Sequence, residues 1–231
     1  MFLPPLQPAV CLNRSNRFTA MVREDGRIHA AHVPSSGRLR ELLFPGNELW
    51  TAPAAREGRV TTRTVYLARA GEDLVCIHTG LSNKLAVEAW EGGILPELAG
   101  YTEVRREVAM GKSRFDLEFR SGAETCPAEV KCVTLVRDKI ALFPDAPTAR
   151  GAKHLCHLAE IARRGRDAAL IFVVQHPGAE KLMPFTEQDP EFARALGEAK
   201  AAGVKTVALG CAVTVDRVVV KTRIMIDGVV A

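Results

Sequence analysis

The sequence predicts an α/β protein in two parts, a small β-barrel followed by a mixed sheet with flanking helices. Short apolar stretches separated by turn residues fill the first 80 residues, and five or so such strands suggest a barrel. After residue 81 the hydrophobic period changes, and the expected elements run α, β, β, α, β, α, β, as in an α/β domain. We therefore place the barrel at residues 1–81 and the α/β domain at residues 82–231.

Turn and loop residues bound the expected strands of the barrel. Glu24-Asp25-Gly26 forms a hairpin-type turn, and Pro34-Ser35-Ser36-Gly37 forms a loop. The expected strands cover residues 17–22, 27–33, 48–52, 61–68 and 74–78.

The elements of the second part follow from capping residues and apolar spacing. Ser82 is the expected N-cap of a first helix, and the helical spacing of Leu155, Leu158 and Ile161 predicts another. The expected order is a helix over 83–91, strands over 114–120 and 128–135, a helix over 148–164, a buried strand over 168–175, a helix over 190–202, a strand over 205–209 and a terminal hairpin around Asp216.

Composition excludes several classes of protein. The chain is 47% hydrophobic and 25% charged, which is typical of a folded soluble protein rather than a disordered one. Its longest apolar run, residues 168–174, is far shorter than the roughly 20 residues of a membrane-spanning helix. The first five residues lack a basic segment and contain two prolines, unlike a secretory signal. We therefore expect a cytoplasmic protein with no membrane partner.

Cysteine spacing argues against a zinc cluster or a disulfide scaffold. The six cysteines are widely scattered and none forms a CxxC pair, so we expect reduced thiols. Cys156 and His157 are adjacent and His154 is near, but ordinary helix residues are the better interpretation of that group.

The positive charge of the chain lies mainly in its first third. The net charge is +4, and all ten basic residues of positions 1–80 are arginines against seven acidic residues. Such an excess permits a polyanionic partner without requiring one, and the planar guanidinium group suits phosphate well. The arginines that we expect to contact a phosphate backbone are Arg14, Arg17, Arg38 and Arg40.

Two carboxylates and a lysine on neighbouring strands form the strongest candidate site. Asp116 lies mid-strand, and Glu129 and Lys131 are two residues apart on the next strand, so they share a face. A hairpin of these strands can bring the three together. Two carboxylates suit Mg²⁺, and a lysine can stabilise a phosphate, which predicts metal-assisted phosphodiester hydrolysis. The alternative is a solvated cross-strand ion pair.

Further residues are candidates for the same site. Glu88 on the preceding helix could hold a water or a second metal, and Glu107 is a rival for that role. Gln175 ends an apolar strand, where sites form in α/β sheets, although a strand that emerges into solvent looks the same.

A basic helix face could hold the phosphate backbone near these carboxylates. On the helix over 148–164, four basic residues lie away from the apolar stripe. An ordinary solvated face is the alternative. The four residues are Arg150, Lys153, His154 and His157.

These residues fall within stretches that resemble the sugar fermentation stimulation protein family. The resemblance covers essentially the whole chain, and its two most specific stretches are Glu129–Leu135 and Phe143–Leu155. The other matching stretches are Phe2–Leu6, Asn83–Ala89, Pro96–Tyr101 and Ser113–Asp116. Two departures are the loop Ser35–Leu39, where the family usually has Asn-Thr-Gly-Ser-Met, and Cys132, where it has a small polar residue.

The resemblance implies an OB-like barrel followed by a PD-(D/E)xK restriction-endonuclease-like domain. It assigns the nuclease pattern to Asp116, Glu129 and Lys131, with Glu88 as the helix glutamate and Asp116 and Glu129 as the Mg²⁺ or Mn²⁺ ligands. It adds DNA, bound largely without sequence preference, as the partner, and a regulatory role in sugar (maltose) metabolism.

Three interpretations stay open at this point. The first is a metal-dependent DNA nuclease in which Arg150 and Lys153 assist the arginines of the barrel. The second is a DNA-binding transcriptional regulator that keeps the nuclease fold as a scaffold without catalysis. The third is a metabolic or RNA-processing enzyme with the same site. Whether the protein forms a homodimer is also open.

Overall fold

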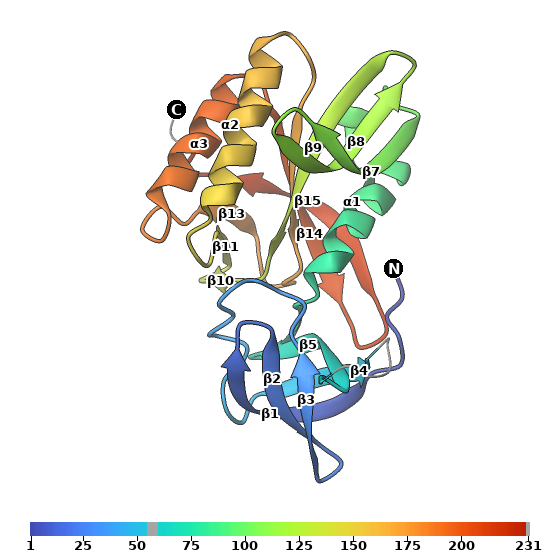
Figure 1. The fold of residues 1–231 in the computed structure, drawn as a ribbon, viewed down its shortest axis with the longest axis vertical. Helices are drawn as coiled ribbons and strands as arrows, with labels where there is room; N and C mark the ends of the chain where they lie inside the picture. Colours follow the sequence, from blue (N-terminus) through green and yellow to red (C-terminus); the bar gives the residue numbers. More distant parts are fainter. Residues whose placement is uncertain (55–59, 230–231) are drawn as a thin grey trace.

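The computed structural model describes residues 1–54 and 60–229 and confirms the predicted fold class (Figure 1). A closed β-barrel built from the first part of the chain lies below a mixed sheet with helices on both faces. The strands of the barrel are β1 (Gln7–Asn16), β2 (Thr19–Glu24), β3 (Arg27–His32), β4 (Glu48–Pro53), β5 (Arg63–Ala70) and β6 (Asp73–Cys76).

The barrel closes through a second pairing of β3. Its strand order is β3-β2-β1-β4-β5-β6, and β3 also pairs with β5. The expected hairpin between β2 and β3 is confirmed, with Asp25 and Gly26 both at positive φ, as a tight two-residue hairpin turn requires. The sequence did not indicate β1, because only Ala9 and Cys11 on this ten-residue strand are buried.

The second part holds the remaining elements. In order they are η1 (Thr79–Leu81), α1 (Ser82–Glu91), η2 (Pro96–Leu98), β7 (Glu103–Met110), β8 (Ser113–Ser121), β9 (Glu124–Val133), β10 (Val136–Arg137), β11 (Ile140–Phe143), α2 (Ala149–Arg163), β12 (Ala169–Val174), β13 (Lys181–Pro184), α3 (Pro190–Ala201), β14 (Lys205–Val213) and β15 (Val218–Ile226).

The central strand β12 organises the nine-stranded sheet, whose order is β10-β11-β13-β15-β14-β12-β9-β8-β7. It lies parallel to both β9 and β14, and all six of its residues are buried. Helices α2 and α3 cover one face of the sheet and α1 covers the other (Figure 1). A strand covered on both faces must be continuously apolar, which is why this run was readable from the sequence.

Helix termini explain where α2 and α3 begin, and one expectation about α1 is wrong. The Thr148 side chain accepts a hydrogen bond from the Gly151 N–H, and Asp189 accepts one from Phe192 N–H. Ser82 is not an N-cap but the first residue of α1, because the turn of η1 continues directly into the helix. Within the described residues, no helix has the length and apolar character needed to cross a membrane.

The edge strand β7 is the largest element of the second part that the sequence did not indicate. Its eight residues carry several charges and are mostly exposed on both faces, so they show neither an apolar run nor clean alternation. Its charged side chains suit a sheet edge, where they oppose pairing with another chain.

Contacts between the barrel and the mixed sheet are extensive. Leu67 and Cys76 of the barrel belong to the same apolar core as α1 and the sheet. Buried Gln175 follows β12, and its side-chain Nε2 donates to the Cys76 carbonyl oxygen at 3.1 Å. The backbone carbonyl of Gln175 accepts from Cys76 N–H at 3.0 Å. At the N-terminus, Leu3 N–H donates to the carbonyl of Asp216, beside the β14–β15 hairpin (Figure 1). Barrel and sheet thus pack as one body.

We expect acid to weaken this junction. Burial lowers the pKa of His78 and of His176, which lie where the barrel meets the sheet. The unfolded chain takes up protons near the ordinary histidine pKa of about 6.5, and the folded chain only at lower pH. The free energy of unfolding should therefore fall as the pH drops through about 6.5. Urea denaturation at neutral and mildly acidic pH measures this loss, and His176→Gln should reduce it. An equal loss in that variant would contradict the assignment.

Candidate active site

The site forms where strands β8 and β9 separate. The two strands pair from Ser121 opposite Glu124 to Leu117 opposite Ala128, and no further. Beyond that point β9 pairs with β12, and the Val130 N–H that would face β8 donates instead to Oδ2 of Asp116 at 2.9 Å. The Asp116 carboxylate therefore takes the place of a strand hydrogen bond and is held at the fork.

Glu129 is buried and touches two basic groups. Only 6% of its side chain is exposed, and Nζ of Lys131 lies 2.5 Å from its Oε1. Nδ1 of His154 lies 2.8 Å from the same oxygen, outside hydrogen-bond geometry. Its Oε2 is buried and has no hydrogen-bond partner among the described residues. Burying a carboxylate oxygen without a hydrogen-bond partner costs free energy, and a bound cation or donor group would remove that cost.

The environment of Asp116 disfavours its charged form. Burial raises the pKa of this carboxyl, and the neighbouring carboxylate of Glu129 raises it further. The hydrogen bond from Val130 and the charge of Lys131 act in the opposite direction. Nδ2 of Asn83, in the first turn of α1, lies 3.5 Å from Oδ1 of Asp116. Two neighbouring carboxylates form a natural cation site.

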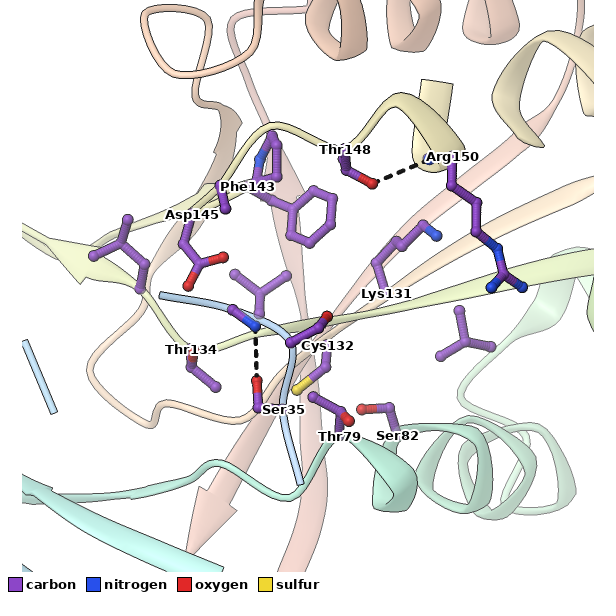
Figure 2. Close-up of a pocket in the computed structure, with 18 of the residues that line it drawn as sticks. Ser35, Thr79, Ser82, Lys131, Cys132, Thr134, Phe143, Asp145, Thr148 and Arg150 are labelled. Atoms are coloured by element: carbon purple, nitrogen blue, oxygen red, sulfur yellow. Dashed lines mark hydrogen bonds between the residues drawn. The ribbon is translucent and has the colours of Figure 1, made fainter. Parts of the chain in front are cut away.

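Asp116, Glu129 and Lys131 line one cleft of about 510 Å³. Figure 2 shows Lys131 on β9 and Arg150 at the start of α2 extending into the same pocket, with Thr148 above and Ser82 below. A segment of the barrel, Ser35–Gly37, crosses the opening and forms another wall. The cleft is thus built from both parts of the chain.

The expected arginines differ in what they contact. Arg17 lines the cleft, and Arg38 and Arg40 line a neighbouring hollow on the barrel. Arg14 also lines that hollow, but it donates to three backbone carbonyls, those of Arg17, Gly37 and Arg38, so its guanidinium group is occupied in holding the barrel loops. Burial lowers its pKa.

Other candidates lie away from the three central residues. Glu88 is about half exposed, and its carboxylate is 3.1 Å from the N-terminal ammonium group, outside the lining of the cleft. Glu107 is exposed and pairs with Arg114. Lys153 is exposed on α2 and is not among the lining residues of the cleft. Gln175 is buried at the junction with the barrel, and its Nε2 donates a hydrogen bond to Sγ of Cys132 at 2.9 Å.

The expectation that His154 lies away from the apolar stripe of its helix, on a basic face, is wrong. The residue is 7% exposed and packs edge-on against Phe115 while it touches Glu129. Its spacing to Leu158 and Ile161 places it on the apolar stripe of α2, which is the signal that could have identified it. His157 lies 2.8 Å from Oγ of Ser113, and Cys156 is exposed.

The residues present fit a hard divalent cation held by few protein ligands. Asp116 and Glu129 offer oxygen donors, and Mg²⁺ commonly uses one or two carboxylates together with water and phosphate oxygens. In the part of the chain that the structure describes, no group of three or more His, Cys, Asp or Glu side chains is arranged around a metal position. Such a pattern is less suited to zinc, which takes three or four nitrogen or sulfur ligands.

Family models match both parts of the chain. The model described as the SfsA N-terminal OB domain matches residues 12–77, and the sugar fermentation stimulation protein RE domain matches residues 80–217. A sugar fermentation stimulation protein homolog of Desulforamulus reducens is 42% identical over 97% of this chain and 94% of its own. One of Shewanella loihica is 39% identical over 91% of this chain and 92% of its own.

A solved structure agrees with these matches over the whole fold. The structure of Pyrococcus furiosus SfsA in complex with Ca²⁺ is similar with a TM-score of 0.90 and 31% sequence identity, and the match covers 98% of each chain. Two family models, full-length relatives and a shared two-part architecture lead to one conclusion: the chain belongs to the sugar fermentation stimulation protein family.

Proposed function

We propose that this protein is a divalent-metal-dependent nuclease that binds DNA with little sequence preference. The observation that carries the proposal is the convergence of Asp116, Glu129 and Lys131 in one cleft that also contains arginines from both parts of the chain. Carboxylates for a cation and basic groups for phosphate are the components that phosphodiester hydrolysis needs. The OB domain of the family model and the complex of the P. furiosus relative with Ca²⁺ support a nucleic acid and a divalent ion as ligands.

The chain's own residues divide the work. Asp116 and Glu129 would hold Mg²⁺ or Mn²⁺, and Val130 N–H fixes the orientation of Asp116. A bound ion would neutralise part of the negative charge on the phosphate. Lys131 places an ammonium group where negative charge grows on the phosphate in the transition state. Arg17 from the barrel and Arg150 from α2, which both line the cleft, would hold adjacent phosphates.

A DNA-binding protein without catalysis is the second candidate, and one observation favours it. Lys131 and His154 both contact the carboxylate of Glu129, so this group already has a positive charge and a ring nitrogen beside it. A closed ion-pair cluster of this kind could serve as a scaffold for binding alone.

Cleavage assays separate the two candidates. Supercoiled plasmid, single-stranded DNA, duplex DNA and RNA would each be incubated with Mg²⁺ or Mn²⁺, and DNA binding would be measured on the same preparation. Metal-dependent cleavage supports the nuclease. Tight binding without cleavage of any substrate supports the second candidate, and the absence of both rejects both.

Affinity for DNA should fall steeply with salt, because contacts with phosphates release counterions. Arg40→Ala should reduce the slope of log affinity against log salt by about one unit, since exposed Arg40 lines the basic hollow. Arg27→Ala is the matched control, because Arg27 is an exposed arginine at the β2–β3 hairpin, at the end of the barrel away from the sheet (Figure 1). Fluorescence anisotropy at several salt concentrations measures both slopes. Equal slopes for the two variants would contradict this use of the hollow.

A further inference from the structure

The cleft at Asp116 continues into a second hollow on the barrel. That hollow also has a volume of about 510 Å³, and the two share four lining residues. The shared residues are Arg17, Ser36, Gly37 and Ala146. Because both hollows border the same segment, they form one groove that runs from the barrel past Gly37 to the carboxylates.

The chemistry of the second hollow suits a chain of phosphates. Arg17, Arg38 and Arg40 line it and are exposed, and none of the described lining residues is acidic. None of these three arginines forms an ion pair with a carboxylate in the described part of the chain. An aromatic platform adjoins it, because the Arg17 guanidinium lies 5.8 Å from the centre of the Phe18 ring, and Phe18 is 47% exposed. Basic groups beside an exposed aromatic ring are typical of proteins that bind unpaired bases.

The wall at Gly37 is fixed from the side of the barrel. The carbonyl of Pro34 accepts hydrogen bonds from N–H and Oγ1 of Thr79. Nη2 of Arg14 donates to the Gly37 carbonyl at 2.8 Å, and Nε of Arg17 donates to the Ser36 carbonyl at 2.8 Å. The segment therefore does not depend on a ligand for its position.

Asp145 holds the same wall from the side of the sheet. The Leu39 N–H donates to Oδ2 of Asp145 at 3.3 Å. A Cβ atom at Gly37 would lie 2.5 Å from that oxygen, so the backbone approaches the carboxylate as closely as a glycine allows. A ligand that needs a wider opening would have to separate the wall from Asp145.

From this geometry we infer that the substrate is a single-stranded nucleic acid that lies along the groove. The inference rests on the proposed nuclease function and names its substrate class. One strand would contact Arg38 and Arg40, stack a base on Phe18, pass Gly37 and reach Asp116 and Glu129. A duplex would bring a second strand, and we expect the fixed wall at Gly37 beside the groove to exclude it. Exposed phosphates and unpaired bases carry the recognition, so it is independent of sequence.

The first experiment compares strands of one sequence. A 30-nucleotide DNA would be offered alone, as a blunt duplex and as a duplex with a single-stranded overhang, together with the same sequence in RNA, each with Mn²⁺. We expect the single strand to be cleaved at least ten times faster than the blunt duplex, and cleavage of the third substrate to be confined to its overhang. Equal rates on single strand and blunt duplex would overturn the inference and leave the nuclease function intact. Cleavage of RNA alone would keep the strand path and identify RNA as its occupant.

Binding measured without metal tests the path of the strand along the groove even if no substrate is cleaved. An absence of cleavage would reject the nuclease function and leave the strand path to be judged from binding. Single-stranded DNA should bind at least tenfold more tightly than the duplex. Phe18→Ala should weaken single-strand binding about fivefold or more, since it removes a stacking contact. Ile28→Ala, which removes another exposed apolar side chain of the barrel, should not weaken it. Equal affinity for both forms of DNA, or equal effects of the two variants, would overturn the path.

Two substitutions of one residue test the wall. Asp145→Ala removes the acceptor of the Leu39 N–H, whereas Asp145→Asn removes the same charge and keeps an acceptor oxygen. The alanine variant should lose most of the preference for single strands over duplex, and the asparagine variant should keep it. If both variants keep the full preference, the wall does not select the strand, and that step of the inference is wrong.

Discussion

Replacing Lys131 with alanine should lower the rate of metal-dependent cleavage on the order of 100-fold or more while DNA affinity changes little. The side chain lines the cleft beside both carboxylates and is only 15% exposed, so its charge acts in a poorly solvated position. A fixed charge that faces the transition state contributes far more to the rate than one phosphate contact contributes to binding. Losing that one contact should reduce the salt slope of binding by about one unit.

The control for this experiment is Lys221→Ala, which removes an exposed lysine of β15 that is not among the lining residues of the cleft. Gel-shift and plasmid-nicking assays on the same preparations give affinity and rate together. Thermal unfolding of each variant verifies the fold, because Lys131 also neutralises buried Glu129. Loss of binding in Lys131→Ala, with normal binding in Arg38→Ala and Arg40→Ala, would contradict the proposed division between cleft and barrel.

The central residues were predictable because strand geometry is local. Glu129 and Lys131 must share a face wherever the strand lies, and the short link between the two strands predicts a hairpin. The buried strand β12 was readable for a similar reason, since its neighbours on both faces force it to be apolar. Each of these features is encoded within about twenty residues of sequence.

The partners of the carboxylates were harder to predict because they depend on packing between distant elements. His154 was placed on a basic face away from the apolar stripe, but the sheet covers the helix face on which it lies. Glu88 was the candidate from the helix, yet in the described structure it pairs with the N-terminal ammonium group, and Asn83 in the first turn of α1 reaches Asp116. Which turn of a helix meets a strand depends on the three-dimensional packing angle, which single-sequence periodicity does not contain.

No local sequence pattern predicts the wall that Gly37 and Asp145 form at the cleft. Gly37 and Asp145 are more than one hundred positions apart, and they meet because β6 ends against β12 and thereby orients the barrel. The loop that departs from the usual family sequence is the one that forms this wall. The arginines of the barrel were identified from composition, but the use of Arg14 to hold backbone carbonyls, rather than phosphate, follows only from the structure.

Asp116→Asn should raise the melting temperature of the metal-free protein and abolish its stabilisation by Mg²⁺. Burial and the charge of Glu129 raise the pKa of Asp116, so at neutral pH its ionised form opposes folding. Asparagine removes that charge and keeps an oxygen to accept from Val130 N–H. At this chain length each kcal/mol of added stability raises the melting temperature by about 2–4 °C. The variant should therefore melt above the wild type without metal.

Metal should reverse that order, which makes the experiment sensitive to where the ion binds. A ligand at 100 times its dissociation constant adds about 2.7 kcal/mol to the stability of a protein that binds it only when folded. Wild type should gain that stabilisation and overtake Asp116→Asn, whose remaining carboxylate cannot hold the ion alone. Glu107→Gln is the control, because Glu107 is an exposed carboxylate paired with Arg114, and it should respond to metal as the wild type does. If Mg²⁺ stabilises Asp116→Asn as strongly as wild type, the ion binds elsewhere, and the same carboxylate pair would then lose its proposed role in catalysis.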